Sequence, residues 1–335
     1  MKACVLKAKN EVEYTEVETP SIKEGEVLLK VHACGICSSD FNRVYKDSAY
    51  FFPIILGHEF SGEIIDCAED IEKNKYIGKR AVVFPLLPCG ECEFCKEKHY
   101  AQCKKYSYFG SRQDGAMTEY IAVPVWNIKI IPDDMAYSVA ALAEPAAVAC
   151  HSANKIEDIK GKSVCISGTG TIGILLGINL KSKGAAVTFL VRNNRKKELL
   201  NKLGFNNFIT AETDKTFDTT IECVGANESL TNCLKLVKSR GEMILVGNPA
   251  SDMMLEKKLY WKILRSEITI KGVWNSEYKS QEIDDWDRAI DFLYKNQKEA
   301  ELLITDKFKL SDGIKAFETV KDNTKLSLKG MFINE

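Results

Sequence analysis

The sequence contains no apolar run approaching the ~20 residues that a membrane-spanning helix needs. It has no excess of charge of either sign, because 46 Lys and Arg residues and 47 Asp and Glu residues give a net charge of −1. A balanced chain has no long-range field that recruits DNA, RNA or an anionic membrane. Its first residues, MKACVLKAKN, lack the apolar core of a secretory signal. These absences predict a cytoplasmic protein that binds neither nucleic acid nor membrane.

Length and cysteine content define the class of protein further. A chain of 335 residues exceeds one ordinary globular core, so we expect two domains. Twelve cysteines without a targeting segment fit a reducing compartment, where thiols bind metals or pack as small hydrophobic groups. We therefore expect no disulfides, and we find no internal repeat or low-complexity segment.

The densest cysteine cluster lies in the loop 85–109, where Cys89, Cys92, Cys95 and Cys103 follow a C-x2-C-x2-C-x7-C pattern. Four thiolates fill the coordination sphere of zinc, and a site with no open position is structural. An iron–sulfur cluster would favour a shorter last spacing with a Pro after it, whereas Lys104 follows here. A nucleic-acid zinc knuckle would usually sit in a basic chain. Four unrelated buried thiols are disfavoured by the regular spacing, so the loop predicts a structural zinc.

A second group of possible ligands lies upstream, in a region up to about Val83 whose short alternating runs predict antiparallel strands. The stretch from Cys34 to Asp40 follows a predicted strand, and Gly57-His58-Glu59 follows an apolar run. A lone Cys or His is more often a packed core residue than a ligand. Two such sets at strand ends make a joint site the better hypothesis.

Downstream, 117–131 has a strand-like pattern and 138–155 an Ala-rich helical one, with Ser138 as a candidate N-cap. The Glu144-Pro145 pair interrupts this helix, because a Pro removes a backbone donor and bends or restarts it. The interruption would aim the Glu144 carboxylate inward. Periodicity alone favours the alternative of a solvated glutamate on a helix surface.

From Lys162 to about Trp274 apolar runs alternate with helical stretches, which predicts a parallel doubly wound sheet. Its predicted elements are strands at 164–167, 187–191, 219–224 and 243–247 and helices at 172–183, 195–203 and 228–239. Beyond about Lys279 this alternation ends. We predict helices at 286–296 and 311–320 and a final strand near 326–333, and this part of the chain would return to the first domain.

A glycine-rich turn joins the first strand and helix of this alternation. It contains Gly168, Gly170 and Gly173 with Thr171 and Ile172 between them. In this context the glycines predict a tight turn, close approach of backbone to a pyrophosphate, and close helix–strand packing. The alternative is a plain turn. We predict a dinucleotide-binding site.

The end of the second strand of this region predicts which nucleotide binds. NAD-binding folds usually carry an Asp or Glu there, but this chain has Val191, followed by Arg192, Asn193, Asn194, Arg195 and Lys196. With no carboxylate to repel a 2′-phosphate, Arg192, Arg195 or Lys196 would pair with it, so we predict NADP over NAD. The alternative is that these cations are solvated and that contacts from Asn193 suffice for NAD.

The order and spacing of these features resemble the zinc-dependent medium-chain alcohol and polyol dehydrogenases over essentially the whole chain. Within that family, segments 85–89, 109–115 and 262–265 are most similar to its polyol-phosphate branch, which acts on substrates such as galactitol 1-phosphate. The resemblance implies an α/β chain with a β-rich GroES-like catalytic domain at 1–145, a doubly wound Rossmann dinucleotide-binding domain at 146–278, and a return to the catalytic domain at 279–335.

The resemblance also implies a catalytic zinc held by Cys37, His58 and Glu144, with Glu59 approaching the metal directly or through water. Such a site keeps one position open for substrate. By the same resemblance Asp40 orients His58, and Ser39 begins a proton relay. Many relatives have a His three residues after that hydroxyl, whereas this chain has Asn42, which cannot carry a proton.

The function implied is hydride transfer between a secondary alcohol of a polyol or polyol phosphate and a nicotinamide cofactor, with about two zinc ions per chain. Galactitol 1-phosphate, ribitol 5-phosphate and sorbitol remain alternative substrates, with the ketose as the reverse substrate. Arg43 and Arg112 are candidates for a substrate phosphate, or solvated cations. A non-catalytic nucleotide-binding redox sensor is the alternative from another class. We expect a homodimer or homotetramer, with 243–246 as the pairing strand.

Overall fold

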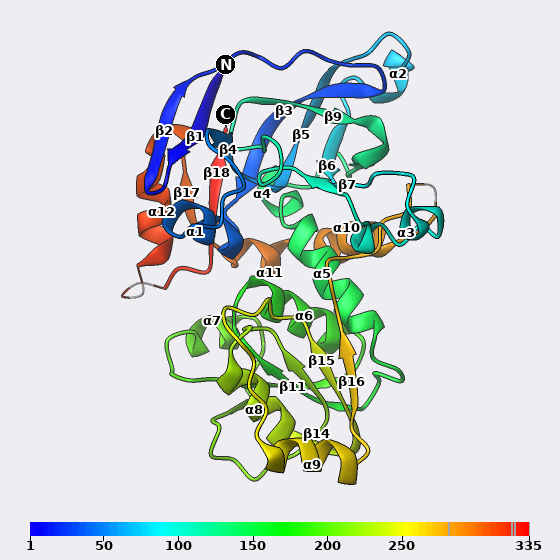
Figure 1. Cartoon of the computed structure of the whole chain (residues 1–335), viewed down its shortest axis with the longest axis vertical. Helices are drawn as coiled ribbons and strands as arrows, with labels where there is room; N and C mark the ends of the chain where they lie inside the picture. Colours follow the sequence, from blue (N-terminus) through cyan, green and yellow to red (C-terminus); the bar gives the residue numbers. More distant parts are fainter. Residues whose placement is uncertain (281, 323, 325, 335) are drawn as a thin grey trace. The chain divides into compact units, whose positions relative to one another are not determined.

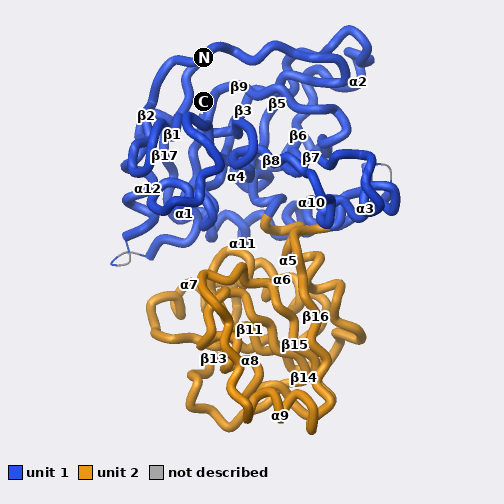
Figure 2. Tube along the Cα trace, viewed as in Figure 1, with its two compact units in different colours: residues 1–144, 277–335 blue, residues 145–276 orange. Residues whose placement is uncertain are grey.

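The computed structural model describes residues 1–280, 282–322, 324 and 326–334. By its internal contacts the chain forms two compact units, which Figure 2 distinguishes by colour. Unit 1 consists of residues 1–144 and 277–335, and unit 2 of residues 145–276. Among the described helices, none is long and apolar enough to cross a lipid bilayer.

Unit 1 is built on a mixed sheet in the order β10-β6-β5-β3-β18-β17, with β9 also paired to β3. All of these pairs are antiparallel except β17 with β18. Its strands are β3 (Glu26–Gly35), β5 (Glu59–Cys67), β6 (Arg80–Val83), β9 (Tyr120–Pro124), β10 (Ile128–Ile130), β17 (Ile304–Phe308) and β18 (Lys329–Ile333). Along β3 buried residues alternate with half-buried ones, which is the burial pattern of a strand with one face on a core.

Two small sheets and several short helices complete unit 1 (Figure 1). The small sheets are β2-β1-β4, made of β1 (Lys2–Ala8), β2 (Glu11–Glu16) and β4 (Ile54–Ile55), and β7-β8, made of β7 (Leu86–Leu87) and β8 (Ser107–Tyr108). The helices are α1 (Ser38–Tyr45), α2 (Lys73–Tyr76), α3 (Glu93–Lys96), α4 (Tyr137–Ala140), α10 (Asp285–Lys295), α11 (Gln297–Glu301) and α12 (Ile314–Lys321). The core between these layers includes Leu29, Val31, Phe60 and Phe332, all buried.

Unit 2 contains a parallel sheet in the order β13-β12-β11-β14-β15-β16. Strands and helices alternate along the chain, as the green-to-yellow part of Figure 1 shows. They are β11 (Ser163–Ser167), α6 (Thr171–Ser182), β12 (Ala186–Leu190), α7 (Lys197–Lys202), β13 (Phe208–Ile209), β14 (Phe217–Glu222), α8 (Asn227–Leu236), β15 (Val237–Leu245), α9 (Lys257–Arg265) and β16 (Thr269–Gly272). Helix α6 contacts β11 and β12, and α8 contacts β14. This confirms the predicted doubly wound sheet.

The predicted helix at 138–155 is two helices, α4 and α5 (Ala143–Asn154). A helix restarts at the Glu144-Pro145 pair, as predicted, because a Pro in a first turn replaces an N–H that has no intrahelical partner. The predicted N-cap was wrong. Ala136 caps α4, and Ser138 lies inside that helix.

The predicted helix at 228–239 ends earlier, at Leu236, because β15 already begins at Val237. Strand β15 pairs with β14 on one side and β16 on the other. The assembly prediction used 243–246 as the strand that pairs two sheets at their edges. This part of the prediction was wrong, because the segment belongs to an interior strand. The edge of the sheet on this side is β16.

Three other boundaries differ from the sequence prediction. The strand-like segment 117–131 is two strands, β9 and β10, separated by a short 3-10 turn that begins after Pro124. Helix α12 begins at Ile314 and not at Ser311, because Gly313 takes a positive φ of 49° that ends the preceding turn. The final strand begins at Lys329; residue 325, just before the predicted start, lies outside the described residues.

Candidate active site, cysteine loop and nucleotide site

The ligand atoms of Cys37, His58 and Glu59 all lie within 4.8 Å of one another. The register between two strands brings them together, since Gly35 at the end of β3 pairs with Glu59 at the start of β5. Cys37 follows as the N-cap residue of α1. A Cβ at position 35 would lie 2.4 Å from Glu59 Oε2, so only glycine permits this approach. Local strand pairing thus places a thiol, an imidazole and a carboxylate at one point.

Asp40 organises the polar groups around this cluster. It is fully buried, and its Oδ2 accepts a hydrogen bond of 3.0 Å from the backbone N–H of Cys37. Its Oδ1 accepts one of 3.0 Å from Arg43 Nη1 and lies 3.7 Å from Nδ1 of His58. Arg43 also donates to Ser39 Oγ at 2.9 Å. Asp40 therefore lies beside His58, and Arg43 is not a solvated cation but a partner of Asp40 and Ser39.

Glu144 is not one of the three grouped ligands, but it interacts with the same cluster. Its Oε1 accepts a hydrogen bond of 3.1 Å from the hydroxyl of Tyr108, whose ring meets the His58 ring edge-on at 5.6 Å. Desolvation raises the pKa of Glu144, and the charge of Glu59 raises it further, while His58 and the Tyr108 hydrogen bond act in the opposite direction. The carboxylate therefore faces the cluster, contrary to the alternative of a solvated helix-surface glutamate.

Lys329, which the sequence did not indicate as a site residue, provides a positive charge opposite the acidic groups of the cluster. It is 4% exposed, and its Nζ donates to Glu59 Oε2 at 2.5 Å and to the backbone carbonyl of Ile36 at 3.1 Å. Burial alone would lower the pKa of Lys329, but the charges of Glu59 and Cys37 outweigh burial and raise it. A buried ammonium thus balances the acidic groups of the cluster.

The donor set fits zinc. A thiolate, an imidazole and carboxylates are its usual ligands, and here they converge from separate elements in a largely buried position. Burial alone would lower the pKa of His58, but adjacent Cys37 and Asp40 raise it to about 10. The imidazole thus lies among negative groups that would also favour a bound cation, while its Nδ1 has no hydrogen-bond partner among the described residues.

The second set of thiols also converges. The sulfurs of Cys89, Cys92, Cys95 and Cys103 lie within 4.8 Å of one another. Backbone amides donate to them, as the N–H of Cys89 does to Cys103 Sγ at 3.3 Å. Backbone hydrogen bonds from Lys104 and Cys95 lower the pKa of Cys92 to about 6, which favours the thiolate that binds metal. None of the twelve cysteines, all of which lie in the described part of the chain, forms a disulfide, so the loop has the donor set of a four-thiolate zinc.

The glycine-rich turn of unit 2 has the conformation that a dinucleotide site needs. Gly168 follows β11 with a φ of +117°, and a Cβ at Gly173 would lie 2.1 Å from the carbonyl oxygen of Gly168. Gly170 caps α6, whose first residues are Thr171 and Ile172, and the space beside its Cα is open. The open side of Gly170 leaves room for a ligand to approach the backbone where α6 begins, and the N–H groups of a helix N-terminus favour an anion.

The residues predicted to select the nucleotide lie near this turn. Val191 is buried directly after β12, and Arg192 is exposed. Lys196 Nζ donates to the carbonyl of Thr169, inside the turn, at 2.9 Å. Burial and the nearby charge of Arg192 lower the pKa of Lys196, so the two cations are close neighbours. Arg195 lies next to them in sequence, and its backbone N–H is bound by Asn193 Oδ1 at 3.1 Å.

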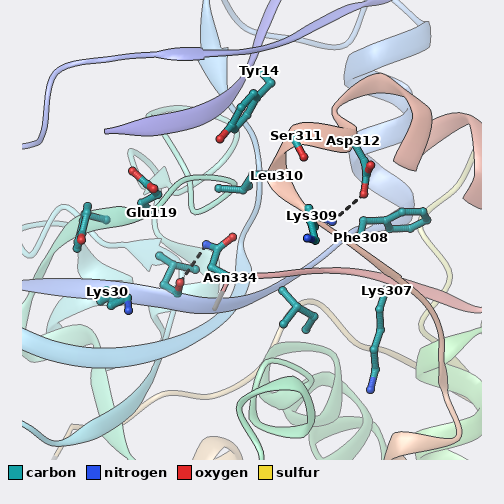
Figure 3. A pocket seen from close by; sticks show the side chains of 13 residues that line it. Tyr14, Lys30, Glu119, Lys307, Phe308, Lys309, Leu310, Ser311, Asp312 and Asn334 are labelled. Atoms are coloured by element: carbon teal, nitrogen blue, oxygen red, sulfur yellow. Dashed lines mark hydrogen bonds between the residues drawn. The ribbon is translucent and has the colours of Figure 1, made fainter.

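A surface hollow of about 750 Å³ lies elsewhere on unit 1 (Figure 3). It contains none of the predicted site residues, and its charges are mixed. Glu119 accepts from the backbone N–H of Lys2, and Lys307 pairs with Glu301 on the surface. Nothing in this lining competes with the cluster described above as the candidate active site.

Comparison with known proteins agrees with this arrangement. The family profile described as "Alcohol dehydrogenase GroES-like domain" matches residues 23–133, and the profile "Zinc-binding dehydrogenase" matches residues 171–295. The galactitol 1-phosphate 5-dehydrogenase of Escherichia coli (strain K12) is 31% identical over 329 residues, which cover 91% of this chain and 92% of that protein. The chain belongs to the zinc-dependent medium-chain alcohol dehydrogenase family.

Family membership confirms the GroES-like domain followed by a Rossmann domain. The D-arabitol-phosphate dehydrogenase of Enterococcus avium is 29% identical, with 95% of this chain and 93% of that protein covered. The crystal structure of galactitol-1-phosphate dehydrogenase from Escherichia coli superimposes with a TM-score of 0.91 at 29% identity, over 100% of both chains. This dehydrogenase is thus similar to oxidoreductases that act on small phosphorylated polyols.

Proposed function

We propose that this dehydrogenase transfers a hydride between a secondary alcohol of a polyol or polyol phosphate, of the galactitol 1-phosphate type, and NADP. The observation that carries the proposal is the buried convergence of Cys37, His58 and Glu59 in a chain that also has an open dinucleotide turn. The substrates named for the curated relatives support the substrate class.

In this proposal Cys37, His58 and Glu144 hold the catalytic zinc, with Glu59 beside them. When bound, the metal supplies Lewis-acid chemistry that favours ionisation of an alcohol or polarises a ketone. A second zinc, held by the four thiols of the loop 85–109, is structural. Its function is to keep the loop folded and not to take part in the reaction.

The protein groups around the cluster have distinct tasks. Asp40, itself fixed by Arg43, lies 3.7 Å from Nδ1 of His58 and attracts the imidazole by its charge, without a hydrogen bond. Lys329 holds Glu59 by an ion pair and so limits its movement. Ser39 Oγ accepts from Arg43, which leaves the hydroxyl hydrogen available for donation to a substrate oxygen or to water. Because Asn42 is exposed and cannot carry a proton, Ser39 exchanges protons directly with solvent in this scheme.

The preference for NADP rests on the cations at the end of β12. Lys196 binds the glycine-rich turn, the exposed Arg192 lies near enough to lower its pKa, and residues 191–197 include no Asp or Glu that would repel a 2′-phosphate. A charge-assisted hydrogen bond contributes about 1.5–3 kcal/mol, which corresponds to about a ten- to hundredfold preference. NADP is therefore the expected nucleotide, with zinc as the metal at both sites.

The proposed function is tested by assaying purified, zinc-loaded enzyme with galactitol 1-phosphate, ribitol 5-phosphate, galactitol and sorbitol and each nucleotide. We expect polyol-dependent reduction of NADP, and ketose-dependent oxidation of NADPH in reverse. Zinc content is measured on the same sample, with about two ions per chain expected. Nucleotide binding without turnover of any polyol would instead support the non-catalytic redox-sensor hypothesis.

A further inference from the structure

Arg112 is held between two tyrosines in the loop that follows β8. Its guanidinium carbon lies 4.0 Å from the ring centroid of Tyr106 and 5.0 Å from that of Tyr50. Nη1 donates to the backbone carbonyl of Tyr106 at 2.6 Å, and Nη2 donates to the Tyr50 hydroxyl at 3.2 Å. Stacking and hydrogen bonds thus fix the plane of this arginine.

The charge of Arg112 has no neutralising partner among the described residues. Among the residues that the structure describes, no carboxylate forms an ion pair with it, and its two hydrogen bonds go to neutral oxygens. Arg43, the other candidate for a substrate phosphate, differs because it forms an ion pair of 3.0 Å with the fully buried Asp40. Arg112 therefore keeps its full positive charge and free N–H donors for an external anion.

A chain of aromatic contacts connects Arg112 with the catalytic cluster. The Tyr106 ring lies 6.4 Å from that of Tyr108, which meets the His58 ring at 5.6 Å and donates to Glu144. Two tyrosine rings thus connect the positive group with the cluster, so a substrate bound at the cluster and extended along these rings would bring its far end to Arg112.

The loop that carries Arg112 is fixed to the segment that carries His58. The N–H of Gly115 donates to the carbonyl of Ile55 at 2.7 Å, and Asp114 Oδ1 accepts from the N–H of Ile55 at 2.8 Å. A Cβ at Gly115 would lie 2.2 Å from the carbonyl oxygen of Gly57, directly before His58. This close packing fixes the distance between Arg112 and the catalytic cluster, as a specificity site requires.

We propose that Arg112, oriented by Tyr50 and Tyr106, binds the terminal phosphate of the substrate and makes the enzyme select phosphorylated over unphosphorylated polyols. The inference rests on the proposed function, which leaves both classes open. A planar guanidinium binds two phosphate oxygens at once, and its stacking on tyrosines keeps that edge oriented. Tyr50 is 63% exposed, so the subsite borders solvent on this side.

The test compares kcat and KM for galactitol 1-phosphate and galactitol in the wild type, Arg112→Met and Arg112→Lys. Methionine keeps an apolar stem between the tyrosines but removes the charge. We expect the wild type to favour the phosphorylated substrate, and Arg112→Met to lose about ten- to hundredfold in kcat/KM for it, mainly through KM. Activity towards galactitol should change by less than about twofold, and Arg112→Lys should retain part of the preference.

Arg288→Met is the matched control, because this arginine of unit 1 is half-exposed and pairs with Asp285 on its own helix. It should leave both substrates unaffected. If Arg112 had only a structural role, Arg112→Met would lower the activity towards both substrates equally and would also lower the melting temperature. That result would overturn the proposal. So would a wild type without preference for the phosphate. If the wild type turned over none of galactitol 1-phosphate, ribitol 5-phosphate, galactitol and sorbitol, the proposed function itself would be overturned. The wild-type assay alone distinguishes this outcome.

Discussion

Replacing Lys329 by Met should be among the most destabilising single changes in unit 1. Lys329 and Glu59 form an ion pair of 2.5 Å in which the two side chains are 4% and 2% exposed. Methionine keeps most of the side-chain volume but leaves the Glu59 carboxylate buried without its counter-charge, beside Cys37 and Glu144. Removing one partner of a buried pair is the costly case, because water does not reach the carboxylate and the remaining positive neighbour, His58, already lies against Cys37 and Asp40.

The expected cost is about 3–5 kcal/mol for breaking a buried pair by removal of one partner. In a domain of about 200 residues each kcal/mol lowers the melting temperature by about 2–4 °C, so the expected decrease is about 6–20 °C. The pKa of Lys329 is raised, so its stabilising contribution is complete below the unfolded lysine value and is lost only as the pH rises through the folded value. The difference between variant and wild type should therefore be constant from about pH 6 to about pH 9.

Lys307→Met on the neighbouring strand β17 is the control. Its pair with Glu301 spans 3.2 Å, but both side chains are more than half exposed, so its loss should cost less than about 1 kcal/mol. Both variants are melted by circular dichroism after metal removal, so that no cation competes for Glu59. If Lys329→Met melts within about 2 °C of Lys307→Met, the buried pair does not stabilise the fold as argued.

Three further predictions concern the loop, the nucleotide and the assembly. Cys103→Ser should lower the melting temperature and reduce zinc from about two ions to about one per chain, and unchanged melting with full zinc content would contradict the structural site. Arg192→Ala should reduce the NADP-over-NAD ratio of kcat/KM by about tenfold or more, whereas a wild type that favours NAD would show that the end of β12 was misinterpreted. Light scattering should give the mass of a homodimer or homotetramer whose interface does not use β15, since that strand is interior. A mass of 37.6 kDa, that of one chain, would reject assembly.

The features predicted from sequence are those that local spacing specifies. The four loop cysteines lie within fifteen residues, and their convergence follows from that short loop. The glycine-rich turn was identified because a strand and a helix flank it, so each glycine has a distinct steric reason. The joint position of Cys37 and His58 followed from two strand ends, which the β3–β5 pairing brings together.

The residues that were missed act over long sequence separations. Lys329 pairs with Glu59 across 270 positions, and no local pattern connects them. The only signal was a lysine that opens an otherwise apolar strand, KGMFI, where burial requires a counter-charge. Tyr108 was overlooked because a tyrosine in a loop has many possible partners, and its bond to Glu144 depends on tertiary folding.

The predicted strand and helix boundaries were wrong where strand pairing in the folded protein overrides local propensity. The stretch 237–239 follows a helix without a breaker, yet Val237 pairs with Phe217 of β14 and begins a strand. The choice of 243–246 as the pairing strand failed for a different reason, because it rested on the resemblance to relatives and on an apolar strand, and neither fixes a strand's place in the sheet. The burial of β15 between β14 and β16 is visible only in the complete sheet order.

The central claim is that the Cys37–His58–Glu59 cluster is where polyol oxidation takes place. The most direct measurement is the initial rate of NADP reduction by zinc-loaded wild type and His58→Ala with galactitol 1-phosphate, with NADP affinity measured in parallel. The account predicts turnover by the wild type, a loss of at least about 10²-fold in His58→Ala, and nearly unchanged NADP binding. Near-normal turnover by His58→Ala would contradict it.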